Sequence, residues 1–158
     1  MSEEFEKGLK IFAEVYGDDQ AQGLRNYLAS DNDSFGKLQA QWSMEWAFGT
    51  VWAREELPRK LRSCAVLGMV IGMGTADEIK YHTKMGVANG LTKDEIQEIY
   101  YSSIPYCGLP KSNLAKAMIM EFGLVNADVV IREDIDQDQL VDVLAGNRIY
   151  LNAVLAIN

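Results

Sequence analysis

Apolar residues recur at helical spacing along almost the whole chain, and no stretch alternates between apolar and polar residues for long enough to form a sheet strand. The first stripe contains Phe5, Leu9, Phe12 and Tyr16, and a Gly-Asp-Asp turn ends it. At 158 residues the chain has the length of one ordinary domain with its own core. These observations predict an all-α fold, a bundle of helices.

Three further helices are predicted in the first half of the chain. A short helix covers about residues 19–28, and a long one covers about 34–52. Several apolar residues of the long helix lie on or near one face: Phe35, Leu38, Trp42, Trp46 and Trp52. Pro58 suits the first turn of the next helix, which continues to Gly74. Because that helix is apolar all round, we expect it to be central.

Two sequence segments have the pattern of a capping box, in which a Thr and a Glu three residues later satisfy the first N–H groups of a helix. Thr75 and Glu78 form the first, at the start of a helix that Gly90 ends. Thr92 and Glu95 form the second, which opens the next helix. The sequence therefore places two helices with defined starts in the middle of the chain.

The last part of the chain differs from the rest. After an amphipathic helix at about 111–122, the sequence becomes acidic and irregular, and only 137–145 has a helical pattern. The apolar segment 151–157 is expected to pack against the body or a neighbouring subunit. We therefore predict a helical domain over residues 1–123 and an acidic C-terminal extension over 124–158.

Charge and hydropathy exclude two classes of partner. A formal net charge of −8 argues against binding to a nucleic-acid backbone. The longest apolar run, 63–74, is much shorter than the roughly 20 residues of a membrane helix. The first residues are acidic and lack the basic and apolar regions of a signal peptide, so we expect a cytoplasmic protein that contacts neither nucleic acid nor membrane.

Cysteine and histidine usage limits the chemistry further. Cys64 and Cys107 are far apart in apolar surroundings, which suits small packed residues in a reducing compartment. With no C-x-x-C and a single histidine, the sequence predicts no metal site.

That single histidine, His82, is the one side chain whose ordinary pKa lies near neutrality, so it is the candidate acid or base. Glu78 lies four residues earlier, on the same helix face, where its carboxylate can orient the imidazole and raise its pKa. Two structural interpretations compete with this one. A glutamate and a histidine four residues apart are also common on the solvated face of a helix. Glu78 could also simply cap its helix.

Four segments in a fixed order carry a resemblance to a known family: Trp52–Ser63, Glu78–His82, Gly90–Ile96 and Tyr106–Pro110. Together they resemble the carboxymuconolactone decarboxylase family, and in particular its γ-carboxymuconolactone decarboxylase branch. The resemblance extends from about Phe5 to Phe122 and implies the helical bundle of that family. It also implies a homo-oligomer, a trimer or hexamer.

The resemblance changes the interpretation of the His82 helix. Alkylhydroperoxidase-like relatives have a C-x-x-C whose cysteines would fall at Thr75 and Glu78, so this chain cannot run their disulfide cycle. The decarboxylase branch keeps a Glu and a His at the positions of Glu78 and His82. These two residues are therefore expected to be the catalytic pair. One departure is Thr50, which stands where the family decarboxylases usually have a Glu.

The expected reaction is the cofactor-free decarboxylation of γ-carboxymuconolactone to β-ketoadipate enol-lactone, a step in the degradation of aromatic compounds. His82 would relay the proton, while Glu78 fixes its tautomer and stabilises the imidazolium. The remaining candidates would bind the small lactone carboxylate: Arg54, Arg59, Arg62, Thr50, Trp46 and Tyr106. Each arginine could instead pair with a surface carboxylate, and Trp42 and Trp52 are expected to be core residues.

Two other functions stay open from the sequence. The same pair could serve a proton-transfer isomerase, or a decarboxylase of a different small lactone or acid. The chain could also be a non-catalytic oligomeric paralogue, in which Glu78 only caps its helix.

Overall fold

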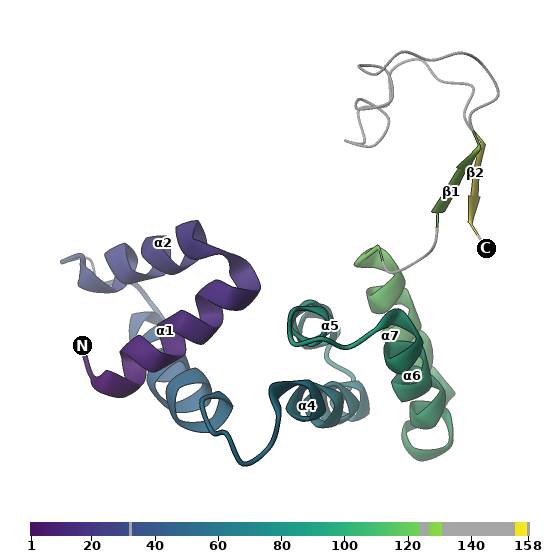
Figure 1. Ribbon diagram of the computed structural model, residues 1–158, viewed down its shortest axis with the longest axis horizontal. Coiled ribbons are helices and arrows are strands. Elements are labelled where there is room, and N and C mark those ends of the chain that lie inside the picture. The colour runs from purple at the N-terminus through teal and green to yellow at the C-terminus, as the bar shows by residue number, and fades with distance from the viewer. Residues whose placement is uncertain (32, 124–126, 131–153, 158) are drawn as a thin grey trace. The chain divides into compact units, whose positions relative to one another are not determined.

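The computed structural model describes residues 1–31, 33–123, 127–130 and 154–157. It divides the chain into two compact units, Met1–Phe122 and Gly123–Asn158. All the helices that the model describes belong to the first unit, and two short strands belong to the second (Figure 1).

Eight helical elements form the first unit: α1 (Glu3–Tyr16), α2 (Asp18–Ala29), α3 (Lys37–Trp42), η1 (Ser43–Trp52), α4 (Arg59–Met73), α5 (Ala76–Ala88), α6 (Lys93–Cys107) and α7 (Leu109–Glu121). α1 packs against η1 and α2, α4 packs against α5, α6 and α7, and α1 also reaches α5. The predicted all-α bundle is confirmed for this unit.

The helices α1 and η1 cross with their backbones in close approach, and two glycines make this contact possible. A Cβ added to Gly8 would lie 2.0 Å from the Met44 carbonyl oxygen. A Cβ added to Gly49 would lie 1.9 Å from the Glu4 carbonyl oxygen. Because side chains are absent at both points, the two backbones pack directly, and Phe5 is fully buried beside them.

The predicted single helix over 34–52 is wrong in one respect, because its second half is a π-helix, η1. Its backbone bonds run from residue i to i+5, and the Thr50 hydroxyl donates a further bond to the Glu45 carbonyl at 2.9 Å. This winding changes which residues share a face. Four side chains expected on one face are exposed: Trp46 on η1, and Phe35, Leu38 and Trp42, which precede η1. The expectation that Trp42 is a core residue is thus wrong for this chain, whereas Trp52 is buried.

α4 begins after Pro58 and ends at Gly74, whose φ of 75° is the left-handed conformation that glycine adopts at no cost. Leu67 and Ile71 are fully buried against neighbouring helices. Met69 and Met73 are exposed on the opposite face. Three helices pack on α4, which agrees with the central position expected of it, although one face of the helix is exposed within one chain.

The two predicted capping boxes have different outcomes. At the start of α6 the box is complete, because Thr92 Oγ1 accepts from the Glu95 N–H at 3.2 Å and Glu95 Oε2 accepts from the Thr92 N–H at 2.8 Å. At the start of α5 the Thr75 side chain accepts no capping bond. Glu78 is therefore not held by a capping box.

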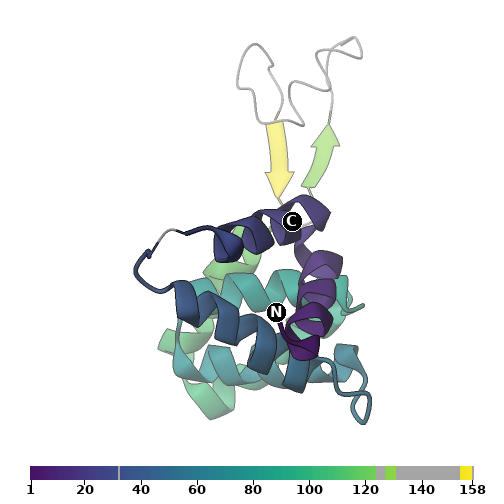
Figure 2. The same ribbon diagram turned by 90° about the vertical axis from the view of Figure 1, so that its left-hand side faces the viewer.

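The second unit contains two antiparallel strands, β1 (Ala127–Val130) and β2 (Val154–Ile157), in a register that pairs Ala127 with Ile157 (Figure 2). Neither strand was predicted, because four residues are too few for an alternating pattern to be recognised. The helix predicted at 137–145 lies outside the described residues. None of the helices in the described part of the chain is long and apolar enough to cross a bilayer.

Candidate active site

His82 lies in the middle of α5 and is largely enclosed by protein. Its side chain is 19% exposed, and its ring stacks on the Trp52 indole with 6.1 Å between the ring centroids and 18° between the planes. Trp52 itself is buried in a cluster with Ile11, Val15 and Met85. The last residue of η1 thus provides a rigid apolar wall for an imidazole on α5.

Glu78 lies one turn before His82, and its Oε2 is 3.5 Å from His82 Nε2. This separation is long for a hydrogen bond but short enough for strong attraction when the imidazole is charged. The Glu78 side chain is 52% exposed, so water screens the pair. Because Thr75 and Glu78 do not form a capping box, the carboxylate is available to the imidazole.

Burial lowers the pKa of His82 below its usual value of 6.5, and the nearby Glu78 carboxylate opposes this shift only in part. Glu78 does raise the pKa of His82, as expected, but burial lowers this pKa by more. His82 Nδ1 is buried and has no hydrogen-bond partner among the described residues. Because a buried polar atom without a hydrogen bond costs free energy of folding, an unpartnered ring nitrogen is typical of a ligand-binding site.

Tyr16, at the end of α1, joins the same surroundings, although the sequence indicated only a core position for it. Its ring packs against the Trp52 cluster, and the ammonium of Lys84 lies 4.9 Å from its centroid. Burial raises the pKa of the Tyr16 phenol, and Tyr81 and Glu78 act in the same direction. Tyr16 therefore keeps its proton and can only act as a neutral hydrogen-bonding group.

Arg62 is the predicted arginine whose surroundings best suit a substrate carboxylate. Its Nη2 donates to the backbone carbonyl of Arg54 at 3.3 Å, while its Nε is buried without a partner among the described residues. Val66, one turn further along α4, packs against the Trp52 cluster. Arg62 thus lies near the element that carries Trp52 and pairs with no described carboxylate.

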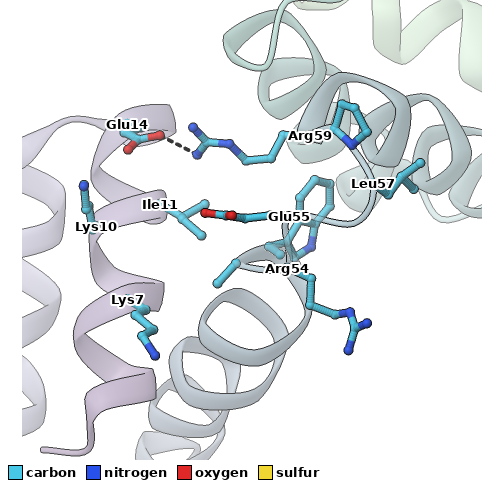
Figure 3. A pocket seen from close by; sticks show the side chains of 11 residues that line it. Lys7, Lys10, Ile11, Glu14, Arg54, Glu55, Leu57 and Arg59 are labelled. Atoms are coloured by element: carbon cyan, nitrogen blue, oxygen red, sulfur yellow. Dashed lines mark hydrogen bonds and ion pairs between the residues drawn. The ribbon is translucent and has the colours of Figure 1, made fainter.

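Arg54 and Arg59 line a pocket of about 490 Å³ between α1 and the loop that follows η1 (Figure 3). Arg59 forms an ion pair with Glu14 across this pocket, and Arg54 pairs with Glu56 at 3.0 Å. Trp52 also lines the pocket, so its indole touches both this space and His82. His82 is not among the residues that line it.

The remaining three candidates are not brought to His82 within one chain. The hydroxyl of Thr50 is bonded to its own helix, and Trp46 is 72% exposed on η1. Tyr106 is 90% exposed and lines a separate groove between α4 and α6, which also contains the half-buried Cys64 and Cys107. Their assignment to substrate binding stays a prediction.

Among the described residues, no three His, Cys, Asp or Glu side chains gather closely enough to hold a metal ion. The described residues offer a half-buried imidazole with a carboxylate beside it, a neutral phenol at the Trp52 cluster, and on α4 a guanidinium without a described carboxylate partner. Such a set can hold an anionic molecule and move one proton.

Residues 39–120 match the model of the carboxymuconolactone decarboxylase family. The chain is 32% identical over 117 residues to the 4-carboxymuconolactone decarboxylase of Acinetobacter baylyi, covering 74% of this chain and 84% of that protein. It is 35% identical over 123 residues to the nitrosuccinic acid decarboxylase of Metarhizium robertsii, covering 77% and 81%.

The C-terminal residues have a different set of relatives. Residues 109–158 match a model described as the C-terminal region of the MMR_HSR1 domain. Over 57 residues the chain is 40% identical to a GTP-binding protein of Methanocaldococcus jannaschii, which is 36% of this chain but only 14% of that protein.

Proposed function

The chain belongs to the carboxymuconolactone decarboxylase family and is a carboxy-lyase, and we propose that its substrate is γ-carboxymuconolactone, converted to β-ketoadipate enol-lactone. The observation that carries the proposal is the half-buried imidazole of His82, stacked on Trp52 and 3.5 Å from the Glu78 carboxylate. The chain's own side chains can supply every step below.

The reaction begins with breakage of the bond between the leaving carboxylate and the lactone ring. The electron pair of this bond moves through the adjacent double bond to the lactone carbonyl, and CO2 departs. Arg62 is our candidate for binding a substrate carboxylate, because a guanidinium offers two parallel N–H donors and this one has a free buried Nε. Enclosure by Trp52 strengthens such an interaction by excluding water.

The second step is protonation of the carbon next to the carbonyl. His82 supplies this proton as an imidazolium and regains one from water after product release. Because burial lowers its pKa, the imidazolium is a stronger acid than free histidine. A bound anionic substrate favours the charged form, and Glu78 stabilises it until the proton is transferred. The neutral Tyr16 phenol is available to donate a hydrogen bond nearby.

A second candidate substrate is nitrosuccinic acid, because a relative named for its decarboxylation is 35% identical to this chain. Both compounds are dicarboxylic acids in which a neighbouring acceptor, a carbonyl or a nitro group, can take up the electrons left by CO2. Thr50, which stands where the family decarboxylases usually have a Glu, leaves room for either substrate.

The decisive experiment is to incubate the purified protein separately with γ-carboxymuconolactone and with nitrosuccinate, and to follow CO2 release and product by NMR. Turnover of the lactone, with His82→Gln inactive but folded, is the expected result. Turnover of nitrosuccinate alone would transfer the assignment to that substrate. Failure with both would leave the family assignment in place and refute the proposed substrate.

The proposal also covers the domain organisation of the chain and its association with further copies. We propose that residues 1–123 are the catalytic domain and 124–158 a separate extension, since the family match ends at residue 120 and the two compact units divide after Phe122. We also propose that copies of this chain associate, because large apolar side chains on α3, on η1 and in the turn before α3 are exposed: Phe35, Leu38, Trp42 and Trp46.

A further inference from the structure

The indole of Trp52 lies against one face of the His82 imidazole. The two ring centroids are 6.1 Å apart, and the two planes differ by only 18°. Aromatic rings prefer such offset stacking, at centroid separations of about 4.5–7 Å. The contact therefore defines the plane of the imidazole, because a ring that turned out of this plane would lose the stack.

The indole is itself held in place from two sides. Trp52 is only 6% exposed and packs in one cluster with three other buried side chains: Ile11 and Val15 from α1, and Met85 from α5. Met85 lies three residues after His82 on the same helix. Because α1 and α5 both contact the indole, it cannot follow the imidazole if that ring rotates.

Stacking alone does not decide which edge of the imidazole faces which neighbour, because a ring rotated by half a turn would remain stacked. Glu78 distinguishes the two edges, since its Oε2 is 3.5 Å from His82 Nε2. A carboxylate can only accept a hydrogen bond, so this arrangement favours the neutral ring with its proton on Nε2. The buried Nδ1, which has no partner among the described residues, is then the nitrogen without a proton.

The charges around the imidazole act on it through one residue. Helices α1, α4 and α7 pack against α5 and carry titratable groups, among them Tyr16, Arg62 and Glu121. Of the described groups, the Glu78 carboxylate is the one whose charge raises the pKa of His82, and burial lowers this pKa by more. The stacked indole supplies part of that burial. Its loss should therefore admit water and raise the pKa of His82 toward 6.5.

We propose that Trp52 is a positioning residue for the decarboxylation: its indole holds the His82 imidazole in one plane, while Glu78 selects the edge that carries the proton. The proposal rests on the proton transfer by His82 that is proposed above. Trp52 acts through the imidazole and need not touch the substrate. A ring that could turn freely would spend part of its time with the proton aimed away from the reacting carbon, which lowers kcat more than it raises KM.

The wild-type protein offers a direct readout, because His82 is its single histidine and gives one set of imidazole signals. Nitrogen NMR of the isotopically labelled protein identifies the tautomer and follows the titration without any substrate. We expect one tautomer, with the proton on Nε2, and a titration midpoint below 6.5. Nuclear Overhauser contacts should join the imidazole protons to the Trp52 indole.

Substitutions then separate the flat aromatic face from simple apolar bulk. Trp52→Leu should lower kcat about tenfold to a hundredfold, with a smaller change in KM. His82 should titrate at higher pH in this variant, so the fall of kcat/KM with rising pH should also move to higher pH. Trp52→Phe keeps an aromatic face and should stay within about threefold of the wild-type kcat, with the wild-type titration.

Phe48→Leu is the matched control. Phe48 also belongs to η1 and packs against the Trp52 cluster, but it does not stack on His82. This variant loses an aromatic ring from the same cluster, so it reports what a change in packing does by itself. We expect the wild-type tautomer, titration and kcat in its folded fraction.

Three outcomes would overturn the proposal. A folded Trp52→Leu protein with the wild-type kcat and His82 titration would refute it directly. Equal changes in Phe48→Leu would reduce the effect to general packing. If Trp52→Leu does not fold, the wild-type spectrum decides, because a mixture of tautomers without contacts to the indole would also refute it. Since these spectra need no substrate, failure here and failure of the proposed function are distinguishable.

Discussion

The crossing of α1 and η1 differs from the surroundings of His82 in how completely the buried groups are packed or hydrogen-bonded. At the crossing, Gly8 and Gly49 let two backbones touch, and the space between them is filled. His82 Nδ1, in contrast, is one of three buried side-chain polar atoms that have no hydrogen-bond partner among the described residues, with Arg62 Nε and Thr75 Oγ1. Each such atom costs free energy of folding that a well-packed contact does not.

This difference separates the part of the molecule that supplies stability from the part that retains reactive groups. Changes at the crossing should affect folding and leave the chemistry of the folded fraction intact. Substitutions around His82 should lower the activity and leave folding nearly unchanged. The four predictions below test this separation, beginning with the largest effect.

Gly49→Ala should destabilise the protein by about 3 kcal/mol or more, because the new methyl group would overlap the Glu4 carbonyl and neither backbone can move freely. Gly23→Ala is the matched control. It lies within α2 with nothing within 4 Å of its added Cβ, and should be neutral or stabilising by up to about 1 kcal/mol. Urea unfolding of both variants measures the difference; equal stability would contradict the role given to the crossing.

His82→Gln should lower kcat by about a hundredfold to ten-thousandfold, the range expected for loss of a general acid. The variant should unfold at nearly the same urea concentration as the wild type at pH 7. Steady-state kinetics and circular dichroism on one preparation decide this. A folded variant that retained full activity would remove His82 from the mechanism.

Arg62→Met should raise KM about tenfold to a hundredfold, because the substrate carboxylate loses its charged donor. The apolar replacement also removes the unpartnered Nε, so stability should not fall. Arg54→Met is the comparison, since that arginine is in an exposed ion pair with Glu56. An equal rise in KM for both variants would argue against a special role for Arg62.

Glu78→Gln should have the smallest effect on rate, no more than about fivefold, because the carboxylate is half exposed. Its clearer effect is on pH dependence. The imidazolium is the active form, so kcat/KM should fall as pH rises through the pKa of His82, which lies below 6.5. Removing Glu78 lowers that pKa further and moves the fall to lower pH. Asp77→Asn, an exposed neighbour on the same turn, should leave the profile in place.

Much of the helical unit was predictable, because local signals determine it. The stripe ending at Tyr16 and the capping box at Thr92 and Glu95 placed α1 and α6 to within a few residues. The winding of η1 was not predictable. A helical pattern assumes 100° for each residue, and bonding to i+5 shifts every later side chain.

The candidate site was also predictable from the sequence only in part. His82 and Glu78 could be paired from the sequence because they share one helix, four residues apart. Trp52 reaches His82 from η1, and Tyr16 reaches the Trp52 cluster from α1, so only tertiary packing brings them there. The three arginines could not be ranked either, since their partners depend on where α1 presents Glu14 and where the loop folds.

The π-helix also determines how this site can vary. Because η1 ends at Trp52, the rotational position of the indole about the helix axis depends on the widened turns before it. Removal of one residue that restored bonding to i+4 would rotate everything beyond it by about 100°. The indole would then leave both His82 and the pocket between α1 and the loop after η1. Insertion and deletion in η1, rather than substitution, are therefore the changes to which this site is most sensitive.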